Sequence, residues 1–225
     1  LSRVINSTYK KNIGWLIEPP SINPNGYKQV VELKDKFDLI FTYSQELISS
    51  DPEKFKWYPH SGCWINDSDI KIHDKGNLLS IIASNKTMTS GHKLRHDVIK
   101  EFSSYMDIFG RGIKDLPYKL DGLSSYMFSI VIENIKYDDY FTEKIIDCFA
   151  SGTIPIYWGT ESVKNFFNED GIIFFNTLEE LGDILYNLTE DDYVSRMDAI
   201  KYNLTKSKEF ILAEDWIFKN YPNCF

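Results

Sequence analysis

The chain alternates between short apolar runs and longer stretches in which apolar residues recur every three or four positions. The apolar runs predict strands at residues 13–17, 37–42, 55–58, 78–83, 106–109, 127–132, 154–157 and 171–175. The stretches with helical spacing predict helices at residues 26–36, 45–50, 93–105, 143–151, 178–188, 191–203 and 206–221. Strands that alternate with helices in this way favour an α/β fold with parallel sheets that are covered on both faces.

A polar stretch at residues 66–76 divides this pattern in two. We interpret it as the linker between an N-terminal lobe at residues 1–75 and a C-terminal lobe at residues 76–225, with a last helix that can return to the first lobe. Because the chain begins with Leu1 rather than Met, it stays open whether the short first lobe is truncated. Ligands of parallel sheets bind outside the carboxyl ends of the strands, so we expect the functional residues there.

The most informative strand end precedes the helix predicted at residues 143–151. Thr142 can cap this helix, and Glu143 and Lys144 occupy its first turn. Unpaired N–H groups at a helix N-terminus attract phosphates, and Lys144 adds a full positive charge there. A carboxylate accepts from hydroxyl groups, so Glu143 suits a ribose, while Tyr140 can hydrogen-bond to a phosphate or stack on a ring. The alternative is an ordinary capped helix whose charged residues are solvated.

A second strand end has the same layout. Ser84 and Asn85 follow a predicted strand, and Arg95 lies in the first turn of the helix predicted at residues 93–105. The forked donors of an arginine can hold a diphosphate, whereas a surface arginine is the alternative interpretation. Two such cations at strand ends of one sheet favour a site for a diphosphate.

Composition and charge exclude several functions. The chain has 225 residues, of which 43% are hydrophobic, and a formal net charge of −8 at pH 7, so its general field would repel nucleic acids and acidic membranes. The three cysteines, Cys63, Cys148 and Cys224, show no disulfide or metal spacing, which favours a reducing compartment. No apolar run reaches 18 residues and no signal peptide is apparent. We therefore expect no membrane span and a cytoplasmic location, with peripheral attachment to a membrane left open.

Two patterns are compatible with a metal site. Asp67 and Asp69 form a D-x-D string in a polar loop, and His92 and His96 have helical spacing without a third ligand. We expect a solvated turn and no zinc, and hence no metal or other cofactor. Aromatic residues are frequent in the first lobe, where most belong to the core and one or two can stack on a sugar. They are Trp15, Tyr43, Trp57, Tyr58 and Trp64.

Three motifs of the second lobe resemble a known family. Residues 128–134 read FSIVIEN, residues 140–147 read YFTEKIID and residues 152–159 read GTIPIYWG. In order and spacing they resemble the signature of family 10 glycosyltransferases, the α-1,3/1,4-fucosyltransferases. Further upstream, Ser84, Asn85 and Arg95 are similar to donor-contacting residues of that family. Glu18, in the segment GWLIEPPS, is similar to its proposed catalytic base.

The resemblance implies a GT-B-like architecture of two Rossmann-type lobes with parallel sheets, the first of which, on the acceptor side, is reduced. It also implies an inverting transfer of fucose from the nucleotide sugar GDP-fucose to a glycan acceptor, with no metal required at the donor site. Glu18 would act as the base, and Arg95 and Lys144 would stabilise the diphosphate. The other donor-binding residues that the resemblance implies are Ser84, Asn85, Glu133, Asn134, Tyr140 and Glu143. Glu133 and Asn134 would lie near the sugar or the phosphates.

Departures from the family pattern leave other functions open. Ile135 stands where the family has Ser or Thr, and Ile22 stands where some members have His, so the acceptor is undetermined. A transferase that uses a different nucleotide sugar is one alternative. A non-catalytic module that binds a nucleotide or a glycan is the other. The pattern says nothing of the oligomeric state.

Overall fold

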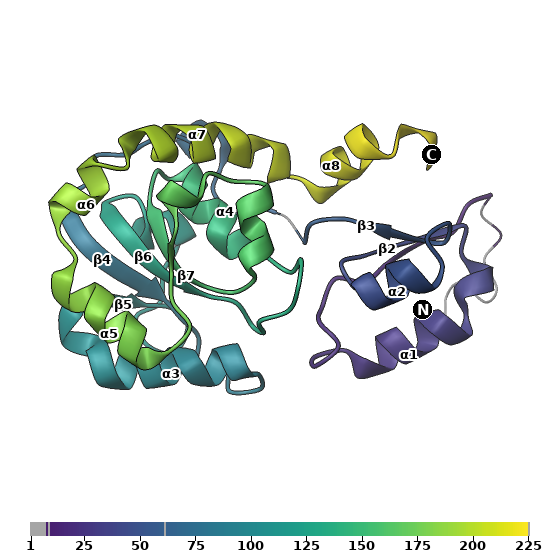
Figure 1. Ribbon diagram of the computed structural model, residues 1–225, viewed down its shortest axis with the longest axis horizontal. Coiled ribbons are helices and arrows are strands. Elements are labelled where there is room, and N and C mark those ends of the chain that lie inside the picture. Colours follow the sequence, from purple (N-terminus) through teal and green to yellow (C-terminus); the bar gives the residue numbers. More distant parts are fainter. Residues whose placement is uncertain (1–7, 9, 61, 225) are drawn as a thin grey trace.

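The computed structural model describes residue 8, residues 10–60 and residues 62–224, and it contains two separate parallel sheets. The first sheet has the order β1-β2-β3, formed by β1 (Ile13–Trp15), β2 (Leu39–Thr42) and β3 (Phe55–Trp57). Helices α1 (Pro24–Glu32) and α2 (Gln45–Ser50) lie against one face of this sheet, where Val30 and Leu47 join the core (Figure 1). The expected parallel α/β arrangement is therefore confirmed.

The second sheet has five parallel strands in the order β5-β4-β6-β7-β8. They are β4 (Asn77–Ile82), β5 (Asp107–Phe109), β6 (Tyr126–Ile132), β7 (Ile154–Trp158) and β8 (Ile173–Phe174). The strand order reverses at β4, because β5 pairs on one side of it and β6 on the other. In such sheets the ligand crevice lies at this switch point, outside the carboxyl ends of the two strands.

Helices cover both faces of the second sheet (Figure 1). Helices α3 (Ser90–Phe102) and α5 (Leu178–Asn187) complete the core on one face, through Val98 and Leu181. Helix α4 (Glu143–Ala150) packs on the other face, with α7 (Met197–Ser207) lying along it. The short helix α6 (Glu190–Val194) connects α5 to α7. Strand β6 is buried along its whole length, and both α3 and α4 contact it. Its carboxyl end therefore lies between α3 on one face and α4 on the other.

The last helix, α8 (Ala213–Asn220), packs on the first sheet (Figure 1), and its Trp216 also contacts the core around α4 of the second lobe. Ile217 joins Phe41 in a small core, and the ring of Tyr221 lies 5.5 Å from that of Phe41. The hydroxyl of Tyr221 also donates to the backbone oxygen of Trp57 at 2.7 Å. The position of the domain boundary within residues 66–76 stays a prediction.

Four of the predicted helices differ from the observed ones by more than one residue. Helix α1 covers Pro24–Glu32 rather than residues 26–36, and the helix predicted at residues 191–203 is divided into α6 and α7. Helix α3 begins at Ser90 rather than at residue 93, because Thr89 caps it by accepting from the backbone N–H of His92 at 3.3 Å. Arg95 is therefore in the second turn and not in the first. The helix predicted at residues 206–221 is broken between α7 and α8. Phe210 is buried in the second lobe and Ile217 against the first, so the chain has to cross between lobes there.

Gly91 allows α3 to pack directly on the end of β6. A Cβ atom at this position would lie 1.7 Å from the backbone oxygen of Glu133. The backbone N–H of Gly91 donates to the backbone oxygen of Asn134 at 3.0 Å. We expect Gly91→Ala to lower the free energy of unfolding by about 1–3 kcal/mol, because the helix has to move away from the strand.

Urea unfolding measures this effect, and Gly76→Ala is the matched control. Nothing lies within 4 Å of a Cβ at Gly76, so we expect a change below about 0.5 kcal/mol there. Equal stability of the two variants would contradict the close contact at Gly91.

Candidate active site

The first turn of α4 is tied to the end of β6 by the carboxylate of Glu133. This side chain is fully buried, and it accepts from both the backbone N–H and the hydroxyl of Thr142 at 2.9 Å. The ammonium group of Lys144 lies 3.1 Å from the same carboxylate. Thr142 in turn accepts from the backbone N–H of Lys144 at 3.3 Å, as an N-cap residue does. Glu133 thus orients the helix start rather than presenting its oxygens to solvent.

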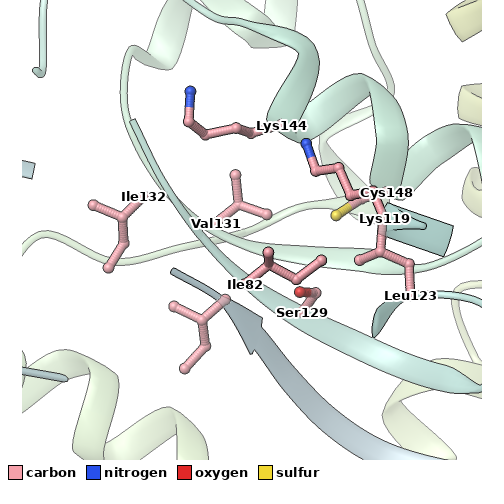
Figure 2. A pocket seen from close by; sticks show the side chains of 9 residues that line it. Ile82, Lys119, Leu123, Ser129, Val131, Ile132, Lys144 and Cys148 are labelled. Atoms are coloured by element: carbon pink, nitrogen blue, oxygen red, sulfur yellow. The ribbon is translucent and has the colours of Figure 1, made fainter. Parts of the chain in front are cut away.

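Lys144 has a donor to spare for a ligand. An ammonium group has three N–H donors, and Glu133 and the hydroxyl of Thr142, at 2.9 Å, take two of them. Glu143 lies further away, at 3.5 Å, and the Lys144 side chain remains 22% exposed. Lys144 lines a small hollow at the end of β6 (Figure 2). The third donor of Lys144 is therefore not taken by a short hydrogen bond to the protein.

Arg95 reaches the same strand end from the opposite face of the sheet. Its Nε donates to the backbone oxygen of Ile132 at 3.0 Å, and its Nη2 donates to that oxygen and to the side-chain oxygen of Asn134, the latter at 3.1 Å. Among the described residues, Nη1 has no acceptor. Burial lowers the pKa of Arg95, while the carboxylates of Glu133 and Glu143 raise it. An arginine still remains protonated in proteins, so one edge of the guanidinium is free for an anion.

The two cations converge at the switch point of the sheet. Arg95 comes from α3 and Lys144 from α4, and they contact the consecutive residues Ile132 and Glu133. The pKa of His92 is lowered to about 4, mainly by burial and then by nearby cations, which include Arg95 and Lys144. The side chain of His92 is therefore near both of them. Together they would hold one diphosphate at the carboxyl end of β6.

Glu143 is held ionised by its surroundings. Burial by itself would raise the pKa of this carboxyl group, but Lys144, Lys119 and His60 outweigh it and lower the pKa to about 2. Its side chain is 25% exposed and lies in the first turn of α4. It is therefore an acceptor for hydroxyl groups, as a ribose contact requires.

We expect Glu143→Gln to lower the free energy of unfolding at pH 7 by about 2–3 kcal/mol. The folded protein holds the pKa of Glu143 near 2, below the ordinary value of 4.5, so its stabilising effect is complete above pH 4.5. That effect is lost as the pH falls from about 4.5 to about 2, because the folded carboxylate is then protonated as well. The difference between variant and wild type should therefore shrink between pH 7 and pH 3 in denaturant titrations.

Glu179→Gln is the control for this experiment. Glu179 also lies in the first turn of a helix, α5, but it is exposed. Its replacement should change stability by less than about 0.5 kcal/mol at either pH. A pH-independent difference for Glu143→Gln would contradict the charge interactions described above.

Tyr140 lies deeper than a stacking residue would. Its side chain is 1% exposed, and its ring lies 4.8 Å from that of Tyr43 and 5.7 Å from that of His60, both of the first lobe. Next to it, Asp139 accepts from the side-chain nitrogen of Gln45 at 2.7 Å. The loop before α4 is thus held by the first lobe, and Tyr140 would contribute its hydroxyl rather than its ring face to a ligand.

Ser84 and Asn85 lie at the end of β4, on the rim of the same crevice. Ser84 is half-buried and Asn85 is exposed. The loop after β5 packs against them, since Gly110 has φ +122° and a Cβ there would lie 1.7 Å from the backbone oxygen of Ala83. At Gly112 a Cβ would lie 3.1 Å from the Asn85 side chain. The loops after β4 and β5 are therefore packed against each other at this edge of the sheet.

Glu18, the predicted base, belongs to the other lobe. It is exposed and lies three residues after the end of β1. Burial raises the pKa of Tyr140, and the charges of Glu133 and then of Glu18 raise it further. Burial lowers the pKa of His60, and the charge of Glu18 is among the smaller effects that oppose this. A carboxylate of the first lobe therefore lies within electrostatic range of the groups around the start of α4.

Three further residues of the site escaped the sequence prediction. Asp147, one turn after Glu143, is fully buried, and it pairs with Lys119 at 2.5 Å and accepts from the backbone N–H of Trp64 at 2.7 Å. Lys119 lines the same hollow as Lys144 (Figure 2), and His60 lies on Tyr140. Asp147 belongs to the YFTEKIID motif, which was a signal, whereas nothing local marks Lys119 or His60.

The residues considered for a metal are engaged otherwise. His92 Nδ1 lies 2.8 Å from the Thr89 hydroxyl, and His96 Nε2 lies 3.0 Å from the backbone oxygen of Lys86. Asp67, which is exposed, and Asp69, which is half-buried, lie in a single turn of 3₁₀-helix. The described part of the chain contains no cluster of three or more His, Cys, Asp or Glu residues that could hold a metal ion. None of its helices is long and apolar enough to cross a membrane.

Comparison with known proteins identifies the family of this chain. Residues 72–197 match the sequence model of the C-terminal region of glycosyltransferase family 10 (fucosyltransferase). The α-(1,3)-fucosyltransferase FucT of Helicobacter pylori is 31% identical over 120 residues, which is 53% of this chain and 21% of that protein. The 4-galactosyl-N-acetylglucosaminide 3-α-L-fucosyltransferase 9 of Mus musculus is 22% identical over 213 residues, or 92% of this chain and 56% of that protein. The chain thus spans between about a fifth and just over half of these relatives.

Solved structures show the same fold. An α1,3-fucosyltransferase crystallised with GDP-fucose superposes with a TM-score of 0.56 at 19% identity, over 92% of this chain and 76% of that one. TarM superposes with a TM-score of 0.63 at 13% identity, over 99% of this chain and 52% of that one. Two lobes with parallel sheets, the first of them reduced, therefore form the expected GT-B architecture. The chain belongs to glycosyltransferase family 10, the fucosyltransferases.

Proposed function

We propose that this protein transfers fucose from GDP-fucose to a hydroxyl group of a glycan, with inversion at the anomeric carbon. The observation that carries the proposal is the convergence of Arg95 and Lys144 on the end of β6, opposite a carboxylate of the other lobe. The names of relatives differ in the acceptor, which is a galactosyl-N-acetylglucosaminide in the mouse enzyme and a protein in the human GDP-fucose protein O-fucosyltransferase 3. The acceptor is accordingly the least constrained part of the proposal.

The proposed reaction is a single in-line displacement. Glu18 takes the proton from the acceptor hydroxyl, whose oxygen forms a bond to the anomeric carbon while the bond from that carbon to the β-phosphate oxygen breaks. The departing diphosphate gains charge, and Arg95, Lys144 and the N–H groups of the first turn of α4 stabilise that charge. Because one displacement occurs on the face opposite the leaving group, the configuration inverts.

The donor residues would divide the nucleotide sugar among them. Glu143 accepts from the ribose hydroxyls, and the hydroxyl of Tyr140 reaches a phosphate. Ser84 and Asn85 contact the donor from the loop after β4. Glu133 and Asn134 do not contact the nucleotide sugar in this proposal; Glu133 orients Lys144 and Asn134 orients Arg95. Since two cations and a helix start stabilise the diphosphate, we expect no metal requirement, and a chelator should leave transfer unchanged.

A panel of nucleotide sugars tests the donor. Thermal shift and calorimetry with GDP-fucose, GDP-mannose, UDP-galactose and CMP-sialic acid should show stabilisation by the two GDP compounds alone. Tighter binding of a UDP- or CMP-sugar would instead favour a transferase with another donor. Release of fucose from GDP-fucose in the absence of an acceptor would distinguish an enzyme from a binding module, which would bind the donor without cleaving it.

The cellular location stays an expectation. All three cysteines, Cys63, Cys148 and Cys224, are free thiols. Unpaired cysteines are typical of reducing compartments, so we expect a cytoplasmic protein, which fractionation of cells that express it would check.

A further inference from the structure

An aromatic hollow adjoins the candidate active site on the side of the first lobe. It has a volume of about 330 Å³, within the range of small-molecule sites. The residues that line it include Trp15, Ile17, Tyr58, His60, Trp64 and Glu214. They come from the end of β1, from the segment after β3 and from the start of α8, so only the folded two-lobed protein assembles this aromatic hollow.

The chemistry of the aromatic hollow suits a neutral sugar. Trp64 is 73% exposed, which is unusual for the largest aromatic side chain and leaves a flat apolar face open to a ligand. Glu214 supplies a carboxylate that can accept from sugar hydroxyls. No Lys or Arg is among the described residues that line the aromatic hollow. A phosphate or an acidic sugar would thus find an acceptor group and no counter-charge.

Trp64 is held in place although its ring is exposed. Its backbone N–H donates to the buried carboxylate of Asp147 at 2.7 Å, and Asp147 is itself paired with Lys119. The neighbouring Cys63 donates to the backbone oxygen of Ile65 at 3.7 Å. The backbone of this segment is therefore fixed, which lowers the entropy lost when the Trp64 ring binds a ligand.

The aromatic hollow leads to the reacting groups through His60. This residue lines it, and the His60 ring also lies 5.7 Å from the ring of Tyr140 in the donor loop. Gly62, another lining residue, lies close to Glu143, since a Cβ built on it would be 3.8 Å from the Cβ of Glu143. Ile17, at the opposite wall, directly precedes Glu18. A ligand seated here would have one end near the proposed base and near the first turn of α4.

We propose that the aromatic hollow binds an uncharged sugar ring of the acceptor glycan, and that this ring stacks on Trp64. The inference rests on the proposed function and deepens it, because it names the class of acceptor and the residue that positions it. Trp64 acts in binding and takes no part in the displacement itself. An aromatic platform that contacts the acceptor equally in the ground state and the transition state raises affinity without changing turnover.

Trp64→Ala tests the proposal in the whole chain. We expect the KM for 4-galactosyl-N-acetylglucosaminide, the acceptor named for the mouse relative, to rise about 10-fold or more, and kcat to change less than about 3-fold. The Kd of GDP and the rate of GDP-fucose hydrolysis without acceptor should stay at wild-type values. Trp64→Phe should recover part of the affinity. The control Tyr186→Ala removes an aromatic side chain that is 78% exposed on α5, outside the aromatic hollow, and should change none of these values.

Direct binding completes the test. Ligand-observed NMR with neutral oligosaccharides, including the same disaccharide, should show contact with wild type and none with Trp64→Ala, while a sialylated form should bind more weakly. An unchanged KM in Trp64→Ala, or the absence of binding of every neutral sugar by wild type, overturns the acceptor site. Failure of wild type to bind GDP or to hydrolyse GDP-fucose would instead overturn the proposed function, whatever the NMR result.

Discussion

Replacing Glu18 by Gln is expected to lower the turnover of fucose transfer about 10²- to 10⁴-fold, while the Kd of GDP stays unchanged. Gln has the same shape as Glu but cannot accept the proton of the acceptor hydroxyl. Glu18 is exposed and lies in the first lobe, whereas the diphosphate site lies at the end of β6, so the substitution should disturb neither folding nor donor binding. Transfer assays with GDP-fucose and calorimetry with GDP measure the two quantities separately.

Glu53→Gln is the matched control for this experiment. Glu53 is likewise an exposed acid of the first lobe, but it precedes β3 at the strand end that faces away from the crevice. Its replacement should leave turnover within about 2-fold of wild type, as for other surface changes. Full turnover in Glu18→Gln would show that another group takes the proton.

The second large effect is expected at the diphosphate. We expect Lys144→Ala to raise the Kd of GDP about 10- to 100-fold, because a charge-assisted hydrogen bond contributes about 1.5–3 kcal/mol. The affinity for guanosine, which has no phosphate, should stay the same. Calorimetry with both ligands therefore separates a lost phosphate contact from a general disturbance of the site.

Lys144→Ala also removes the partner of a buried carboxylate, so its control must address stability. In this variant the buried carboxylate of Glu133 loses the ammonium group of Lys144 but keeps its hydrogen bonds with Thr142. We therefore expect a lower free energy of unfolding. Urea unfolding of the variant shows whether the protein is folded at the temperature of the binding experiment. Lys164→Ala, which removes a surface lysine paired with Glu161, should leave GDP binding unchanged. Equal affinity of wild type and Lys144→Ala for GDP would contradict the proposed diphosphate site.

The start and end of α4 show what local sequence signals can predict. Thr142 caps the helix, and Gly152 follows its end with φ +69°, a backbone conformation that favours glycine. Each of these two signals, the cap at the start and the glycine after the end, involves only residues within one turn of that end of the helix. The prediction of residues 143–151 therefore agrees with the observed helix Glu143–Ala150 to within one residue.

The start of α3 shows where local signals were insufficient. The helical spacing predicts a start at residue 93, three residues later than the observed start at Ser90. The structure shows that Gly91, between these two positions, is needed for the close approach of α3 to the backbone of Glu133. Such a contact joins residues about 40 positions apart, and no periodicity within the helix reveals it.

The amino-acid sequence by itself determined the alternation of strands and helices, the capped start of α4 and the motifs shared with family 10. These depend on side chains that are neighbours along the chain, so their spacing carries the information. Only the tertiary structure decided that Arg95 and Lys144 meet at the end of β6, that Glu133 is buried between Thr142 and Lys144, and that α8 returns to the first sheet. Those arrangements arise from the order of strands in the sheet and from burial, which bring together residues that are far apart in sequence.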